Sequence, residues 1–136
     1  MNIMADTMEE YSNYHWDTKK ILVVEDDESS AFLLKEILKD TGASIEYTTD
    51  GEEAVEYIRK NPETDLILMD IHLPEKDGFT ATREIKAFAQ NVVVIAQTAY
   101  SFSVDHQQAE EAGCDAFLTK PLNPSLLLDK MNNYLS

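Results

Sequence analysis

A strict alternation of strand-like runs and helical segments is the feature of this sequence that most constrains its fold. Five strand-like runs, at 21–24, 45–49, 66–69, 92–96 and 116–118, are each followed by a segment with apolar residues at helical spacing. Continuous apolar runs are typical of parallel strands that helices cover on both faces. Because crossovers between parallel strands are right-handed, the pattern predicts a single doubly wound (βα)5 sandwich of the α/β class around a five-stranded parallel sheet. The pattern alone leaves the order of the strands open.

Capping residues mark where the predicted helices begin and end. The helices are expected at 29–39, from Asp50 to Asn61, at 79–89, at 103–112 and from Pro124 onward. Glu53 completes a capping pair with Asp50, and Asn123 before Pro124 is a typical helix start. Helical spacing predicts that these side chains face the core: Phe32, Leu33, Ile37, either Leu34 or Leu38, Ala54, Val55, Ile58, Ala81, Ile85, Phe88, Leu127, Met131 and Tyr134.

The composition is that of one acidic domain. The chain has 136 residues, and 43% of them are hydrophobic, which is enough for one core. Its 26 acidic and 11 basic residues give a net charge of −15, which argues against direct DNA or RNA binding through a basic face. The single Cys114 excludes an internal disulfide framework, and no apolar run approaches the roughly 18 residues of a membrane span. We therefore expect a cytoplasmic protein that does not insert into membranes.

Residues 1–18 are interpreted as an N-terminal arm or linker, and residues 19–136 as the folded domain. The first eighteen residues have no clear periodicity and no apolar core of a signal peptide. Tyr11, Tyr14 and Trp16 nevertheless cluster there. The alternative is a short strap that packs Trp16 on the domain.

Chemically active side chains follow four of the five predicted strands. Glu25, Asp26 and Asp27 follow the first strand, Asp70 and His72 the third, Thr98 and Tyr100 the fourth, and Lys120 the fifth. Each residue alone is more often a helix start, a turn former or a surface charge. In an open parallel sheet, however, ligands bind beyond the carboxyl ends of the strands. The joint placement therefore predicts one crevice that gathers carboxylates, a hydroxyl and an ammonium group.

Clustered carboxylates in this crevice predict a site for a hard divalent cation. Two carboxylates about 5 Å apart repel each other by roughly 3 kcal/mol at an effective dielectric constant of about 20. Oxygen ligands without clustered Cys or His select Mg²⁺, or the similar Mn²⁺, over zinc. Beside such an ion a carboxylate can act as a nucleophile and form an aspartyl phosphate. Asp70 is the best candidate because it stands alone at the end of the central strand, and Thr98 and Lys120 can contact the phosphoryl group.

These residues lie in stretches that resemble the receiver domain of two-component response regulators and hybrid sensor kinases. The stretches are ILVVEDD (21–27), DLILMDIHLPEKDGF (65–79), VVIAQTAY (93–100) and AGCDAFLTKPL (112–122). The resemblance implies a flavodoxin-like strand order, 2-1-3-4-5, and a cis bond between Lys120 and Pro121. It also implies a phosphoacceptor signalling domain rather than an ordinary enzyme. The implied partners are a sensor histidine kinase or a histidine phosphotransfer protein.

The resemblance also assigns roles at the metal site. Asp70 matches the phosphoacceptor of the family. The implied ligands of Mg²⁺ are Asp26, Asp70, Glu25 through a water molecule, and the backbone carbonyl of His72.

The remaining matched positions concern the response to phosphorylation. Thr98 and Phe117 match the switch hydroxyl and the switch aromatic, and Lys120 matches the amine that pairs with the phosphoryl group. The expected result is a change of the face formed by residues 100–135, which also allows dimerisation through that face. His72 and Tyr100 flank the expected reaction path, and we hypothesise that they hinder the attacking water in autodephosphorylation.

Other functions and another domain organisation are the alternatives to a stand-alone receiver domain. A phosphohydrolase of the haloacid-dehalogenase class needs a second acid two residues after the nucleophile, where this chain has His72. The four glycines are too far apart for a nucleotide-binding loop. A pseudo-receiver, an interaction module that is never phosphorylated, would lack an acid, the threonine or the lysine. Whether the receiver stands alone, which the initial Met favours slightly, or belongs to a hybrid kinase stays open.

Overall fold

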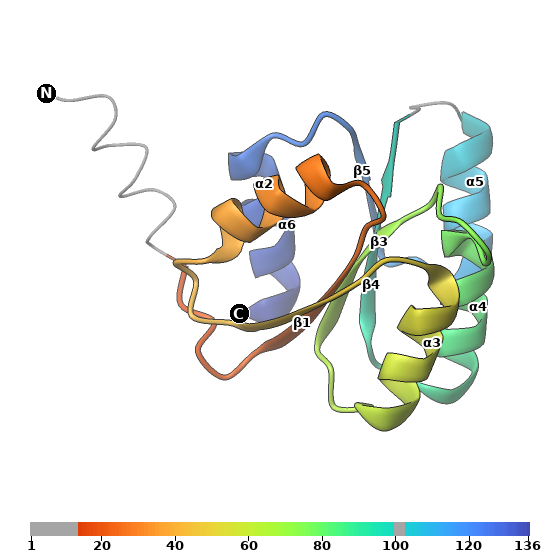
Figure 1. The fold of residues 1–136 in the computed structure, drawn as a ribbon, viewed down its shortest axis with the longest axis horizontal. Helices are drawn as coiled ribbons and strands as arrows, with labels where there is room; N and C mark the ends of the chain where they lie inside the picture. The colour runs from red at the N-terminus through yellow and green to blue at the C-terminus, as the bar shows by residue number, and fades with distance from the viewer. Residues whose placement is uncertain (1–13, 100–102) are drawn as a thin grey trace, which may run out of the picture.

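Five parallel strands form one sheet in the order β2-β1-β3-β4-β5, which confirms the order implied by the resemblance. The computed structural model describes residues 14–99 and 103–136 (Figure 1). The strands are β1 (Lys20–Val24), β2 (Ser44–Thr48), β3 (Leu66–Asp70), β4 (Val93–Thr98) and β5 (Ala116–Thr119). The helices are α2 (Glu28–Leu38), α3 (Gly51–Lys60), α4 (Gly78–Phe88), α5 (Ser103–Ala112) and α6 (Pro124–Leu135). The Lys120–Pro121 bond is cis, as expected.

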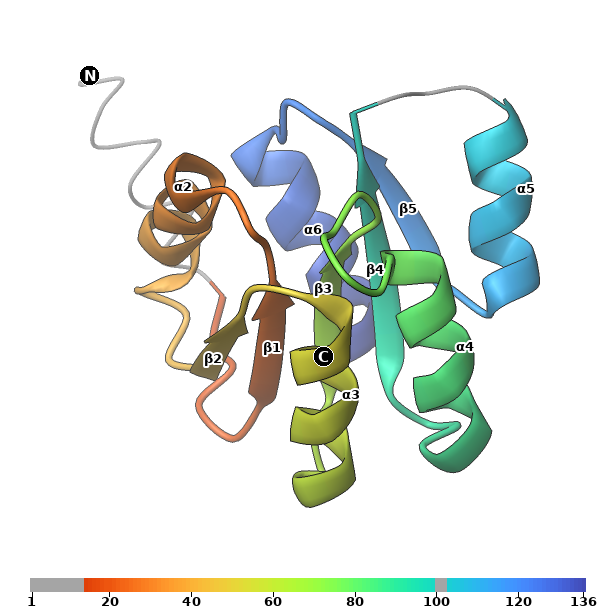
Figure 2. The same cartoon turned by 45° about the vertical axis from the view of Figure 1, so that its right-hand side comes forward.

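Helices cover both faces of the sheet, as the apolar strands predict. Helices α2 and α6 lie on one face, and α3, α4 and α5 lie on the other (Figures 1 and 2). Every residue of β3 is buried, because this strand lies in the middle of the sheet between two helical layers. Alternate strand residues feed two separate cores. Val23 and Leu68 pack with α2 and α6, whereas Val24 and Met69 pack with α3 and α4.

Side-chain caps start the helices where the sequence predicts them. The carboxylate of Asp27 accepts a hydrogen bond from the backbone N–H of Ser30 at 2.8 Å and opens α2. Asp50 accepts one from the N–H of Glu53, also at 2.8 Å, and opens α3. Asn123 opens α6 in the same way, with Pro124 in the first turn. These caps fix the chain direction just after strands whose ends carry the polar residues.

Four predicted core side chains are instead exposed on the surface. Phe32 is 65% exposed, Leu33 45%, Phe88 39% and Tyr134 40%. In α2 the sequence carries apolar residues on more than one face, and the sheet selects the face with Leu34, Ile37 and Leu38. Periodicity cannot make this choice, because it does not say which of several apolar faces meets the sheet.

The segment 14–18 packs Trp16 on the domain, which agrees with the alternative interpretation of this segment as a short strap. Trp16 is 2% exposed and belongs to the core between the sheet, α2 and α6. Its backbone N–H donates to the carbonyl of Thr41 at 2.7 Å, and its indole Nε1–H donates to Oδ1 of Asn132 at 3.0 Å. The segment thereby ties the end of α2 to α6. The earlier part of the predicted arm, including Tyr11, lies outside the described residues.

No helix in the described ranges is long and apolar enough to cross a membrane.

Candidate functional site

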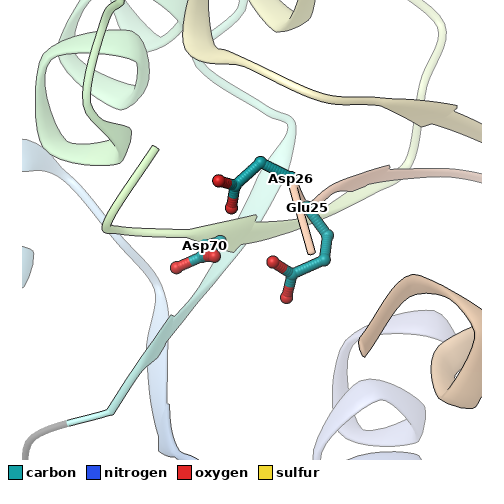
Figure 3. Close-up of side chains that lie close together, drawn as sticks. All are labelled: Glu25, Asp26 and Asp70. Atoms are coloured by element: carbon teal, nitrogen blue, oxygen red, sulfur yellow. The ribbon is translucent and has the colours of Figure 1, made fainter. Parts of the chain in front are cut away.

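The carboxyl ends of β1 and β3 bring three carboxylates together. Glu25 and Asp26 follow β1, and Asp70 is the last residue of β3. One carboxylate oxygen from each residue lies within 4.8 Å of the other two, and the three side chains gather at the strand ends (Figure 3). Glu25 and Asp70 are buried, while Asp26 is exposed to solvent. The strand ends thus gather the carboxylates as the sequence predicts, with Asp26 on the side exposed to solvent.

Lys120 supplies the positive charge of this cluster. Its ammonium Nζ lies 2.8 Å from Oε1 of Glu25 and 3.3 Å from Oδ2 of Asp70. The backbone N–H of Lys120 donates to the carbonyl of Thr98 at 2.6 Å, so its main chain continues β5 alongside β4. The lysine side chain therefore crosses β4 to reach the two acids. We call Glu25, Asp70 and Lys120 the ion group.

The ion group has two acids, Glu25 and Asp70, for one base, Lys120, and both acids are buried. Burial raises the pKa of Glu25, and the hydrogen bond and charge of Asp70 raise it further, against the opposing effect of Lys120. Burial acts to lower the pKa of Lys120, but the hydrogen bond that its ammonium donates to Glu25 and the charges of both acids outweigh this effect and raise the pKa. A further positive charge at this position would relieve the repulsion between the carboxylates.

The donor set fits a hard divalent cation. Three carboxylates offer oxygen atoms within reach of one another, and within the described part of the chain no His or Cys joins this group. Mg²⁺ uses one or two carboxylates, keeps several waters and needs an open side, which the exposed Asp26 provides. Glu25, Asp26 and Asp70 are thus suitable ligands, and the backbone carbonyl of His72 stays a predicted one.

The loop after β3 is closely attached to Asp70. The backbone N–H of His72 donates to Oδ1 of Asp70 at 3.0 Å, which leaves Oδ2 toward Lys120. Gly78 closes the loop: its N–H donates to the carbonyl of Ile71 at 3.0 Å, and a Cβ at this position would lie 2.4 Å from the carbonyl oxygen of Asp70. Only glycine allows this close approach, so the loop holds Asp70 in place.

Thr98 and Phe117 lie on the other face of the sheet, toward α5. Thr98 is fully buried, and its Oγ1 lies 3.5 Å from Nε2 of His72. Phe117 is half-buried against the small core that includes Ala109 and Ala112 of α5. Its ring centroid is 3.9 Å from that of His106, also on α5. Tyr100, the second residue proposed to control autodephosphorylation, lies outside the described residues.

One polar residue beside the site was missed from the sequence. Gln97 is fully buried in β4, in register with Asp70 of the neighbouring strand. The sequence carried a signal for it: Gln97 directly follows the apolar run VVVIA, so a polar side chain continues a strand that is otherwise apolar. Asp27, also beside the site, caps α2, and its backbone N–H donates to Oε2 of Glu25 at 3.3 Å.

Comparison with known proteins identifies one family. The profile of the response regulator receiver domain matches residues 21–132. The polar-differentiation response regulator DivK of Brucella ovis is 32% identical over 120 residues, which cover 87% of this chain and 97% of the relative.

Solved structures give the same result. The receiver domain of the sensor histidine kinase PA1611 from Pseudomonas aeruginosa, determined with a magnesium ion in its active-site cleft, is 32% identical, with a TM-score of 0.80 over 86% of this chain and 97% of that one. The receiver domain of Ssk1 from Saccharomyces cerevisiae, crystallised with the histidine phosphotransfer protein Ypd1, is 29% identical. It has a TM-score of 0.80 over 86% of this chain and 88% of that one.

We expect Asp70→Asn to stabilise the ion-free domain near pH 7, because it removes one charge from the crowded carboxylates. The pKa of Glu25 is raised in the folded chain. The contribution of Glu25 to the free energy of unfolding is therefore fully present below pH 4.5, its ordinary pKa, and is lost as the pH rises through the raised pKa of the folded state. The variant should exceed the wild type in free energy of unfolding by about 1 kcal/mol at pH 7, and the difference should narrow toward pH 5.

Urea unfolding in the presence of a chelator, followed by circular dichroism, measures this difference. Asp129→Asn, at an exposed position of α6, is the control and should change little at either pH. A variant that is less stable than the wild type at pH 7 would show that the pairing with Lys120 outweighs the carboxylate repulsion.

Proposed function

The chain belongs to the family of response regulator receiver domains, and on this basis we propose that Asp70 accepts a phosphoryl group from a phosphohistidine protein. Receiver domains are signalling switches of two-component systems, not ordinary enzymes. The observation that carries the proposal is the ion group at the strand ends, where a buried carboxylate lies 3.3 Å from an ammonium group and beside two further acids. The surroundings of Asp70 thus suit a group that gains negative charge.

The proposed transfer uses the oxygen atoms of Asp70 directly. A carboxylate oxygen of Asp70 forms a bond to phosphorus while the P–N bond of the donor's phosphohistidine breaks. The electron pair of that bond leaves with the imidazole nitrogen, which takes up a proton. Lys120 stays beside Asp70 and pairs with the phosphoryl oxygens, and the hydroxyl of Thr98 donates to another of them.

Mg²⁺ or Mn²⁺ is the proposed cofactor. Glu25, Asp26, Asp70 and the carbonyl of His72 would hold it. The bound ion supplies positive charge that stabilises the transferring phosphoryl group.

The proposed response runs through Thr98 and Phe117 to the face formed by residues 100–135. A phosphoryl group on Asp70 carries a charge of about −1.5 to −2, in place of the −1 of the free carboxylate, and brings three strong acceptors beside Thr98. Movement of Thr98 toward it leaves space for Phe117, which already contacts α5 through His106. Dimerisation through this face and a cytoplasmic location stay predictions. A pseudo-receiver is disfavoured because the acids, Thr98 and Lys120 are all present.

Incubation with acetyl phosphate and Mg²⁺ tests the chemistry. We expect the intact mass of the wild type to increase by one phosphoryl group, because the carboxylate of Asp70 can attack a small acyl phosphate without a partner protein. Asp70→Asn and the wild type with a chelator should show no gain, whereas Asp129→Asn should react normally. An unmodified wild type, or equal phosphorylation of Asp70→Asn, would contradict the proposal.

A groove between α2 and the loop before α6 is the proposed docking surface for the phosphodonor. Ser30, Leu33, Lys120, Pro121 and Leu122 line it, so it is continuous with the ion group through Lys120. A donor histidine must reach Asp70, and a protein seated in this groove would lie directly beside that residue. Leu33 is 45% exposed there. The co-crystal of the similar Ssk1 receiver with Ypd1 supports a histidine phosphotransfer protein as occupant.

Leu33→Glu is therefore expected to slow phosphotransfer from a histidine phosphotransfer protein about tenfold or more, because it places a charge in an apolar contact. Its rate with acetyl phosphate should equal that of the wild type. The donor is the phosphotransfer protein that reacts fastest with the wild type in a panel. Phe88→Glu, at the exposed C-terminal end of α4, is the control. Equal slowing by both variants would argue against this groove.

The hypothesis on autodephosphorylation predicts a shorter lifetime of the phosphoryl group when His72 and Tyr100 are reduced to Ala. We expect the half-life to fall several-fold, because water reaches phosphorus more easily past small side chains. Intact mass at intervals after removal of the donor measures the decay. His15→Ala, an exposed residue before β1, serves as control, and an unchanged half-life in the double variant would refute the hypothesis.

A further inference from the structure

The carboxamide of Gln97 is a buried polar group that the proposed function does not use. Gln97 has no exposed surface, and neither Oε1 nor Nε2 has a hydrogen-bond partner among residues 14–99 and 103–136. A buried carboxamide without partners is unfavourable, because both its ends have lost water. Such a group is expected to gain a partner in some state of the protein.

The sheet register places Gln97 in one row with Asp70 of the ion group. Parallel neighbours share a face, and Gln97 lies in register with Asp70 on one side and Leu118 on the other. The preceding row of this face consists of Val23, Leu68, Ile95 and Ala116, which all pack in the core with α2 and α6. Two positions further along each strand, on the same face, come Glu25, Asp70, Gln97 and Leu118, and Lys120 follows Leu118 on this face after two more positions.

The side chain of Lys120 must cross β4 to reach its partners. Its main chain lies beside β4, and its ammonium contacts Asp70 at the end of β3 and Glu25 after β1, both on the far side of β4. At the level of Asp70, the residue of β4 on this face is Gln97. Because Lys120 lies two positions beyond Leu118, the register partner of Gln97, its side chain must run back toward the level of Gln97 to reach Asp70.

The charge balance of the ion group changes when the site is used. The ammonium of Lys120 has three N–H donors, and within the described part of the chain its two acceptors are Glu25 and Asp70. A divalent cation competes for both carboxylates, and phosphorylation converts Asp70 to an acyl phosphate. Lys120 then has the phosphoryl oxygens as partners, but both of its carboxylate acceptors are engaged elsewhere, which leaves an N–H of the ammonium for another acceptor of the protein.

We propose that Gln97 is a positioning residue for Lys120: its carboxamide oxygen accepts an N–H of the ammonium when Glu25 and Asp70 are engaged by the cation or the phosphoryl group. Gln97 holds Lys120 over Asp70 in that state and does not itself contact the phosphoryl group. This inference rests on the proposed phosphoryl transfer to Asp70.

Gln97→Met tests the role, because it keeps the length of the side chain and removes the carboxamide. We expect phosphorylation by acetyl phosphate to slow about three- to tenfold, the range that corresponds to one hydrogen bond, while stability to urea is unchanged or higher. Gln97→Asn, which retains a carboxamide, should recover part of the rate.

In a Lys120→Met background, Gln97→Met should cause no further loss of the phosphorylation rate. Thr48→Val removes a buried hydroxyl that likewise has no hydrogen-bond partner in the described part of the chain, on the opposite face of the sheet, and should leave the rate unchanged.

A second measurement requires no phosphoryl transfer. Glu25→Gln weakens one acceptor of Lys120, so the NMR signals of the Gln97 side-chain amide should shift in this variant and return when Lys120→Met is added. An unshifted amide signal overturns the inference, as does a wild-type phosphorylation rate in Gln97→Met, or an equal loss with and without Lys120. If the wild type takes up no phosphoryl group, the proposed function fails separately, and the amide signal still decides the contact between Gln97 and Lys120.

Discussion

The contact of one ammonium group with two buried carboxylates is the interaction on which the site depends. Lys120 lies 2.8 Å from Glu25 and 3.3 Å from Asp70, three residues far apart in the sequence. Partly buried charges of this kind persist only where opposite charges and hydrogen bonds compensate the lost water. The compensation is incomplete, because the acids outnumber the lysine. The excess negative charge is what makes the site suitable for a divalent cation.

The two faces of the sheet separate the proposed chemistry from the proposed response. Glu25, Asp70 and Lys120 continue the strand rows that pack against α2 and α6, whereas Thr98 and Phe117 belong to the face covered by α4 and α5. Asp70 lies near both groups of residues because it is the last residue of β3. Beyond the strand ends the sheet no longer separates its two faces. A phosphodonor protein can therefore approach along the α2 side while the response develops on the α5 side.

Sequence reasoning predicted the elements more reliably than their surfaces. The caps at Asp27, Asp50 and Asn123 lie where their local hydrogen bonds require, since each involves a backbone N–H within three residues. Phe32 and Leu33 were wrongly placed in the core, because α2 carries more apolar residues than one face can bury. Trp16 could be placed only through contacts with Thr41 and Asn132, which lie 25 and 116 positions away.

The sequence by itself determined the alternation of strands and helices, and therefore a doubly wound sheet whose strand ends gather the polar residues. These features follow from local periodicity and from the handedness of crossovers. Only the tertiary structure decided which acids meet Lys120, which helix faces stay exposed, and that Gln97 is buried in register with Asp70. Each of these depends on the strand register and on side-chain contacts across the sheet. A linear sequence pattern specifies neither the register nor these contacts.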